Sequence, residues 1–135
     1  MKNYIKIARP DHWIKNMFIM PGIVMGLLIF GLEKLVPNIG NIIIGTIATC
    51  FIASANYVIN EWLDAGYDKY HPVKKNRPVV VADLKVQYVM MEYVLLILAG
   101  LGLSFIINRS FFWVEVLLLV MGFFYNVKPF RTKDI

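Results

Sequence analysis

The sequence has a single cysteine and few charged residues. Cys50 stands alone among 135 residues, which excludes a disulfide within the chain and a metal centre built from several thiolates. Only 17% of the residues are charged and 59% are hydrophobic, a composition too apolar for a soluble domain of this length. Low-complexity tracts and Gly/Ser-rich linkers are also missing. We therefore expect one transmembrane domain over residues 1–135, without an internal boundary.

Four apolar stretches contain most of the hydrophobic residues. They cover roughly residues 17–35, 39–59, 86–107 and 111–127. Each is close to the ~20 residues that cross a hydrocarbon core of ~30 Å as a helix. Because a bilayer offers the backbone no hydrogen-bond partners, continuous apolar segments of this length form helices. The sequence therefore predicts an all-α, polytopic membrane protein with four transmembrane helices and one long loop at residues 60–85.

The basic residues predict how these spans are oriented. Of the 14 Lys and Arg residues, only Lys34 and Arg109 fall in the two short connections on one side of the spans. By the positive-inside rule, both termini and the 60–85 loop face the cytoplasm of a multi-pass inner (plasma) membrane protein. The first apolar run exceeds a signal-peptide core and ends without a cleavage site, so we expect it to remain as a span. The net charge of +5 follows from this topology, and no nucleic-acid partner is expected.

Polar side chains with oxygen ligands gather directly after the second apolar stretch. They are Asn60, Glu61, Asp64 and Asp68. If the helix continues past the membrane, all four fall within an arc of about 100° on one face. Carboxylates at this spacing repel one another unless a positive charge lies between them. Oxygen ligands that share an ion with phosphate favour Mg²⁺, so this face is a candidate magnesium site.

A basic cluster follows the acidic face within a few residues. It consists of Lys74, Lys75 and Arg77. An arginine offers a two-pronged fork to phosphate oxygens, and a lysine offers a mobile point charge. A carboxylate cluster followed by a basic cluster predicts a site for a magnesium–diphosphate complex. The alternative interpretation is a solvated loop of mixed charge that only enforces the topology.

Four stretches resemble the UbiA superfamily of intramembrane prenyltransferases. NEWLDAGYD is similar to the first aspartate-rich motif of that family, N-D-x-x-D-x-x-x-D. HPVKKNRP and ARPDHWIKN resemble motifs of the subgroup that includes decaprenyl-phosphate phosphoribosyltransferase. YNVKPFRTKD is similar to the cytoplasmic segment after the family's fourth helix. The resemblance covers nearly the whole chain.

This resemblance implies a transferase whose site lies at the cytoplasmic mouth of a helical bundle. The implied metal ligands for Mg²⁺ are Asn60, Glu61, Asp64 and Asp68, of which Asp64 and Asp68 are also the implied catalytic residues. The implied substrate-binding residues are Lys74, Arg77, Arg9, Lys15 and Asn16. The implied partners are a polyprenyl phosphate or diphosphate lipid, a diphosphate-bearing donor and the membrane lipids.

Two reactions fit this resemblance. In the favoured one, phosphoribosyl diphosphate donates a phosphoribosyl group to a polyprenyl phosphate, as the HPVKKNRP and RPDHWIKN runs indicate. In the other, a polyprenyl diphosphate donates its prenyl group to an aromatic or other small acceptor. A third interpretation is a membrane fragment that binds a metal without catalysis.

Two features depart from the family pattern. Glu61 stands where aspartate is usual, and its additional methylene moves the carboxylate outward, which matters because Mg²⁺ demands near-ideal octahedral geometry. The resemblance also implies a longer chain with a second acidic motif. We therefore expect the sequence to be the N-terminal half of a bundle, inactive alone, that is completed by the missing C-terminal half or by another copy.

For several other residues the sequence also predicts a role. His71 precedes Pro72, which predicts that the motif helix ends nearby and favours loop capping or phosphate binding over a general-base role. Glu115, near the outer end of the fourth span, is expected to be structural. Anchoring at the headgroup level is expected for Trp13, Trp62 and Trp113.

Overall fold

The structure, a computed structural model, describes residues 2–82 and 84–127. Every regular element in these ranges is a helix, which confirms the predicted all-α class. Four helical stretches are long and apolar enough to cross a membrane, which confirms the predicted polytopic architecture. These stretches are Lys2–Phe30, Leu32–Asp68, Val86–Ile107 and Arg109–Asn126.

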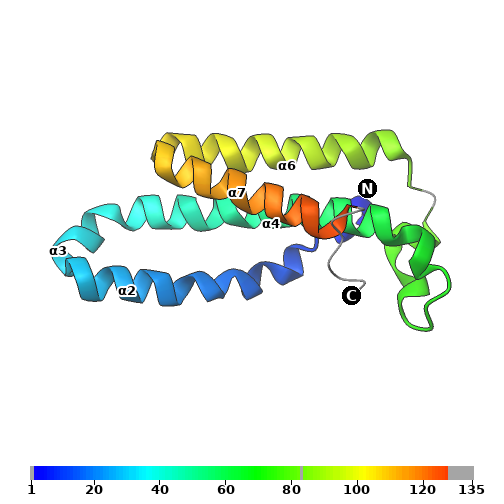
Figure 1. The fold of residues 1–135 in the computed structure, drawn as a ribbon, viewed down its shortest axis with the longest axis horizontal. Coiled ribbons are helices and arrows are strands. Elements are labelled where there is room, and N and C mark those ends of the chain that lie inside the picture. The colour runs from blue at the N-terminus through cyan, green and yellow to red at the C-terminus, as the bar shows by residue number, and fades with distance from the viewer. Residues whose placement is uncertain (1, 83, 128–135) are drawn as a thin grey trace.

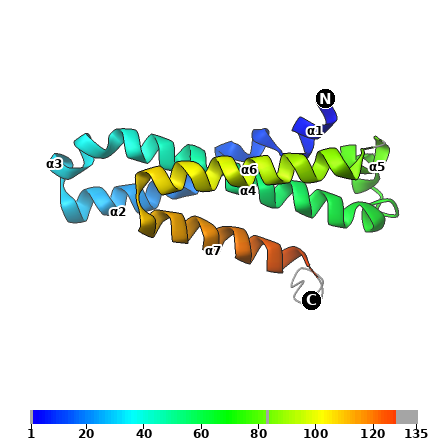
Figure 2. The ribbon, with the colours of Figure 1, turned by 90° about the horizontal axis from the view of Figure 1, so that it is seen from above.

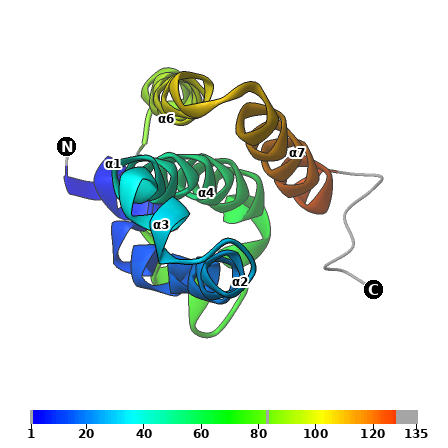
Figure 3. The same ribbon diagram turned by 90° about the vertical axis from the view of Figure 1, so that its left-hand side faces the viewer.

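One long helix, α4 (Ile39–Asp68), forms the centre of the bundle. In the end-on view it lies between α2 (Met20–Phe30), α6 (Val86–Ile107) and α7 (Arg109–Asn126) (Figure 3). Its 30 residues span ~45 Å, which exceeds the ~30 Å hydrocarbon core. The helix therefore continues past the apolar stretch, and its last turns carry the acidic motif, as the sequence predicted.

Shorter elements connect and flank these helices (Figure 1). They are α1 (Lys2–Ile7), the 3₁₀ helix η1 (Pro10–Ile19), α3 (Leu32–Leu35), η2 (Val36–Asn38), η3 (Lys74–Asn76) and α5 (Pro78–Val81). We call the end of the bundle that carries α1, η3, α5 and the end of α4 the basic end, because residues 69–77 and the N-terminal lysines gather there. The α3 turn lies at the opposite end.

The first span differs from its expected range of 17–35. Its regular α-helix ends at Phe30, because Gly31 adopts φ 75° and ψ 168°, a conformation that interrupts a helix and that glycine accepts without steric cost. At its other end, residues 10–19 form a 3₁₀ helix and not the first turns of an α-helix. Composition defined the span, whereas a single glycine decides where its helix stops.

The turn between α6 and α7 is tight. Asn108 caps α7, because its side-chain oxygen accepts a hydrogen bond from the backbone N–H of Phe111 at 2.8 Å. The two helices run antiparallel from this turn, and α7 diverges from α6 toward its C-terminal end (Figure 2), where Asn56 of α4 still donates a hydrogen bond to the backbone oxygen of Leu118 at 3.3 Å. The second pair of spans is therefore a helical hairpin laid on α4.

Small residues bring α6 close to α4. Gly100 of α6 faces Ile52 and Ala48, both of which are fully buried in α4. Ser104, one turn further, is also fully buried, and its hydroxyl donates a hydrogen bond to the backbone oxygen of Gly100 at 2.7 Å. Close backbone approach at small residues is a common way for helices to associate in lipid, where burial of apolar surface contributes little.

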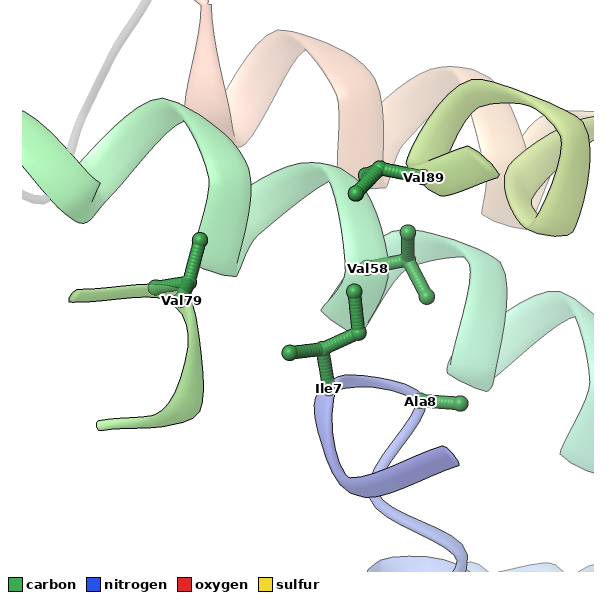
Figure 4. Close-up of a cluster of buried hydrophobic side chains, with 5 residues drawn as sticks. All are labelled: Ile7, Ala8, Val58, Val79 and Val89. Carbon is green, nitrogen blue, oxygen red and sulfur yellow. The ribbon is translucent and has the colours of Figure 1, made fainter. Parts of the chain in front are cut away.

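A cluster of buried aliphatic side chains closes the basic end (Figure 4). It consists of Ile7 and Ala8 from the N-terminal segment, Val58 from α4, Val79 from α5 and Val89 from α6. Four segments far apart in the sequence therefore meet at one point beside the acidic turns of α4. The phenol oxygen of Tyr4 also accepts a hydrogen bond from the backbone N–H of Lys85 at 3.1 Å.

The close approach of α4 and α6 predicts a difference between two glycines of the same helix. A Cβ at position 100 would lie 2.7 Å from Ile52 and 3.0 Å from the backbone oxygen of Ala48, whereas one at position 102 would meet nothing within 4 Å. Overpacking of this kind costs about 1–3 kcal/mol. We expect Gly100→Ala to lower the thermal unfolding midpoint in detergent micelles and Gly102→Ala to leave it unchanged or raise it. Equal midpoints for the two variants would contradict the described packing.

Candidate functional site

The acidic face of α4 is buried at the basic end. Glu61, Asp64 and Asp68 expose only 1%, 7% and 4% of their surface, although carboxylates are rarely buried without a partner. Asn60 lies beside them and is partly exposed. The structure thus places the four predicted metal ligands on one stretch of helix, with three carboxylates turned away from solvent.

Two arginines neutralise this face. Arg9 donates a hydrogen bond through Nη2 to Oε1 of Glu61. Arg77 donates through Nη1 to Oδ2 of Asp68 at 2.6 Å, and its Nε lies 3.7 Å from the same Oε1 of Glu61. Glu61 therefore lies between two guanidinium groups, one from each side of the sequence motif.

The aliphatic cluster explains why both arginines reach the acidic face. Ile7 and Ala8 are buried in that cluster immediately before Arg9, whose left-handed backbone (φ 49°) turns the chain from α1 into η1. Arg77 precedes Pro78 and Val79, and Val79 belongs to the same cluster. Apolar packing therefore holds the backbone of each arginine next to α4, and only the side chains have to span the remaining distance.

Beyond Arg9, the N-terminal segment runs antiparallel along α4. Trp13 donates its indole N–H to the hydroxyl of Ser54 at 2.8 Å and packs edge-on against Phe51, with ring centroids 5.7 Å apart. Trp13 was expected to anchor the chain at the lipid headgroups, whereas in the structure its polar atom makes a hydrogen bond inside the bundle. Trp62 likewise packs against the aliphatic cluster, whereas Trp113 is 65% exposed.

The three substrate-binding residues predicted from the N-terminal motif do not all lie at the acidic face. Arg9 joins the acidic face, but Asn16 donates to the sulfur of Cys50 at 3.0 Å, ~16 Å along α4 from Glu61. Lys15 is exposed, with Nζ 3.4 Å from a ring nitrogen of His12. The structure therefore brings one of these three residues to the carboxylates.

The residues of the basic cluster after α4 also differ in whether they reach the acidic face. Arg77 contacts the acidic face, whereas Lys74 is exposed in η3, and none of the ion pairs among the described residues joins it to a carboxylate. His71 accepts hydrogen bonds at Nδ1 from the backbone N–H groups of Val73 and Lys74, at 3.2 and 3.3 Å. Its capping of the loop agrees with the expectation from sequence, and α4 ends before it at Asp68.

A further polar contact inside the bundle was not expected from sequence. Thr49 of α4 donates its hydroxyl to Oε1 of Glu115 in α7, and Glu115 is 2% exposed. Both residues line a largely apolar cavity of about 470 Å³ between α2, α4 and α7. The available signal was the run of small and hydroxyl residues in α4 around Gly45 and Thr49, which indicates a close helix neighbour. The structural role expected for Glu115 agrees with this contact.

The donor set on α4 fits a hard divalent cation in its chemistry. Asn60 and the three carboxylates supply only oxygen and amide groups, and Oε2 of Glu61 is buried without a hydrogen-bond partner among the described residues. In the arrangement seen here, however, no three His, Cys, Asp or Glu side chains of the described residues are placed to ligate one ion. The residues suit the ion, while the arginines occupy oxygens that it would use.

The last predicted motif, YNVKPFRTKD, is described only as far as Val127. Its basic residues Lys128, Arg131 and Lys133 lie outside the described residues, as does Asp83 of the central loop. Asn126, the last residue of α7, is buried and donates to the backbone oxygen of Gly122 at 2.8 Å.

Four stretches that are long and apolar enough to cross a membrane, with a buried carboxylate–arginine site at one end of the bundle, define a polytopic membrane protein. The chain belongs to the UbiA prenyltransferase family, which matches residues 19–135. This match confirms the resemblance drawn from the motifs.

Individual relatives support the same family. The chain is 33% identical over 104 residues to the decaprenyl-phosphate phosphoribosyltransferase of Corynebacterium glutamicum, covering 76% of this chain and 30% of that protein. It is 27% identical over 135 residues to the digeranylgeranylglyceryl phosphate synthase of Sulfurisphaera tokodaii, covering 100% of this chain and 46% of that protein. It is 30% identical over 100 residues to the nodulation protein NoeC of Azorhizobium caulinodans, with 73% and 30% covered.

The chain therefore spans less than half the length of these curated relatives. No solved structure matches it significantly.

The contact between Arg9 and Glu61 makes a prediction about stability. Removing one partner of a buried ion pair leaves an uncompensated charge, at a cost of about 3 kcal/mol. We expect Arg9→Gln to lower the unfolding midpoint in detergent clearly more than Lys6→Gln, because Lys6 is an exposed residue of α1.

Replacing both partners should recover most of the loss, because the double variant Arg9→Gln/Glu61→Gln buries two neutral amides. A double-mutant cycle of unfolding midpoints measures this coupling. Strictly additive effects would show that the two side chains do not interact.

Proposed function

We propose that the complete protein is a Mg²⁺-dependent UbiA-type transferase that displaces diphosphate in a reaction with a polyprenyl substrate. The observation that supports this proposal best is the burial of three carboxylates on one face of α4, next to two arginines, at the end of a bundle that can cross a membrane. Family membership supports the same class of reaction. In this proposal the described chain supplies one part of the site.

In this proposal the oxygen-bearing side chains would bind the metal ion and the basic side chains would bind phosphate. Asp64 and Asp68, with Asn60 and the unpartnered Oε2 of Glu61, would hold the ion. When bound, Mg²⁺ would neutralise the charge that develops on the departing diphosphate. Arg77 and Arg9 would bind phosphate oxygens, with Lys74 adding a mobile charge at the mouth.

The interior of the bundle suits the lipid substrate. The cavity between α2, α4 and α7 is lined mainly by aliphatic side chains, so it would accommodate polyprenyl units. Lys15 and Asn16 would contact the substrate further along η1 than Arg9 does.

The favoured reaction is phosphoribosyl transfer. A phosphate oxygen of the polyprenyl phosphate attacks the anomeric carbon of phosphoribosyl diphosphate, and the bond from that carbon to the diphosphate oxygen breaks. Similarity to the decaprenyl-phosphate phosphoribosyltransferases of Corynebacterium glutamicum and Mycolicibacterium smegmatis, at 33% and 31% identity, favours this version.

A second candidate is prenyl transfer from a polyprenyl diphosphate to a small acceptor. The match to the digeranylgeranylglyceryl phosphate synthase extends over the whole chain, and this observation favours the second reaction. Both candidates use the same acidic face and differ in which substrate carries the diphosphate.

The metal assignment can be tested on the full-length protein in detergent or nanodiscs. We expect Asp64→Asn and Asp68→Asn each to lower turnover of labelled phosphoribosyl diphosphate with polyprenyl phosphate by about 100-fold or more. Glu33→Gln, which alters an exposed carboxylate in α3, is the matched control and should keep wild-type turnover.

Turnover in both aspartate variants equal to that of the control would refute the assignment of the metal ligands. The same preparations, supplied with a polyprenyl diphosphate and an aromatic acceptor, separate the two candidate reactions. Turnover with only this pair would replace the favoured reaction by the second.

We also propose that the basic end faces the cytoplasm of the inner membrane, because Lys34 and Arg109 are the only basic residues at the opposite turns. The measurement is labelling with a membrane-impermeant maleimide in a Cys50→Ser background. Lys34→Cys should react in intact cells, and Lys75→Cys should react only in inverted vesicles. The reverse pattern would invert the orientation.

A further inference from the structure

The arginines at the acidic face use the same oxygens that a metal would need. Oε1 of Glu61 is shared by Arg9 and Arg77, and Oδ2 of Asp68 accepts from Arg77. A guanidinium stays charged at any pH a protein tolerates, so these contacts cannot be relieved by deprotonation of the arginine. A cation can reach these oxygens only if the guanidinium groups move away from them.

A bare divalent cation would gain little from that exchange. It would leave two positive side chains close to a new positive ion, in a place where the side chains of Arg9 and Arg77 are only 24% and 21% exposed. Like charges in a poorly solvated site repel strongly. The three described carboxylates would then face two guanidiniums and a dication.

A diphosphate removes this obstacle because it offers the guanidiniums new acceptors. The planar fork of an arginine matches phosphate oxygens as well as it matches a carboxylate. If cation and diphosphate entered together, the carboxylates would hold the cation and the arginines would hold the phosphate oxygens, so each charged group would again have an opposite charge beside it.

The packing at the basic end permits such an exchange without unfolding. Ile7, Ala8 and Val79 hold the backbone on either side of the site, so only the two arginine side chains have to rotate. Their partly exposed side chains already reach the surface, where a diphosphate arrives.

We propose that Arg9 and Arg77 are resident counter-ions that make the site select a metal–diphosphate complex over a bare divalent cation. This inference rests on the proposed function, since it assumes that the same face receives both ligands. It assigns the arginines a role in specificity in addition to phosphate binding: they compete with metal alone and cooperate with the complex.

The test measures two affinities on the full-length protein by isothermal titration calorimetry. One titrant is Mg²⁺ alone, and the other is the preformed magnesium–pyrophosphate complex. We expect Arg77→Gln to tighten binding of Mg²⁺ alone several-fold and to weaken binding of the complex by about tenfold, within the usual range of coupling between ligands. Lys34→Gln, which removes the charge of an exposed lysine in α3 at the opposite end of the bundle, should change neither affinity.

Opposite signs for the two titrants are the decisive result. If Arg77→Gln weakens both affinities, or leaves binding of Mg²⁺ alone unchanged, Arg77 is not a counter-ion that competes with the metal and the proposal is overturned. Arg77→Lys guards against misfolding, because it keeps the charge. It should retain the weak binding of Mg²⁺ alone while losing part of the affinity for the complex.

The proposed reaction can fail separately. Suppose that the wild-type protein binds the magnesium–pyrophosphate complex more tightly than Mg²⁺ alone but turns over neither phosphoribosyl diphosphate nor a polyprenyl diphosphate. This result would refute the proposed reaction and leave the counter-ion role intact. Turnover by the wild type, together with weakened binding of both titrants in Arg77→Gln, would overturn the counter-ion role alone.

Discussion

The structure depends on the neutralisation of three buried carboxylates on α4. Glu61, Asp64 and Asp68 lie near the end of a helix that is otherwise built for an apolar environment, and an unpaired carboxylate there would cost several kcal/mol. Arg9 and Arg77 meet that requirement for Glu61 and Asp68. Arg9 comes from the N-terminal segment and Arg77 from the loop after α4, so both segments take part in this neutralisation.

Apolar packing and charge pairing support each other at the basic end. The aliphatic cluster of Ile7, Ala8, Val58, Val79 and Val89 sets the path of the backbone, and the ion pairs complete it with side chains. Neither is sufficient alone, because the cluster does not neutralise charge and the long arginine side chains do not define a backbone path. The result is a polar site held at the end of an apolar bundle.

Much of this could be predicted from local features of the sequence. The apolar stretches predicted the four spans, and the spacing of Asn60, Asp64 and Asp68 predicted that they share a helix face, since α4 continues to Asp68. The end of the first helix at Phe30 was missed, because Gly31 lies inside a hydrophobic run whose composition gives no sign of a positive φ. The inward position of Trp13 was missed because a tryptophan near a span end serves equally well at the interface and against a helix.

The sequence by itself determined the class of protein and the number of spans, and it predicted candidate metal and phosphate ligands, because each of these depends on residue type and on spacing along one helix. The tertiary structure decided which of the basic residues reach the carboxylates. Arg9 and Glu61 are 52 positions apart in the sequence. The packing of α1, α5 and α6 around α4 brings Arg9 to the acidic face, whereas Asn16 contacts Cys50 further along the helix. Contacts between distant segments depend on the shape of the whole core, which local spacing does not encode.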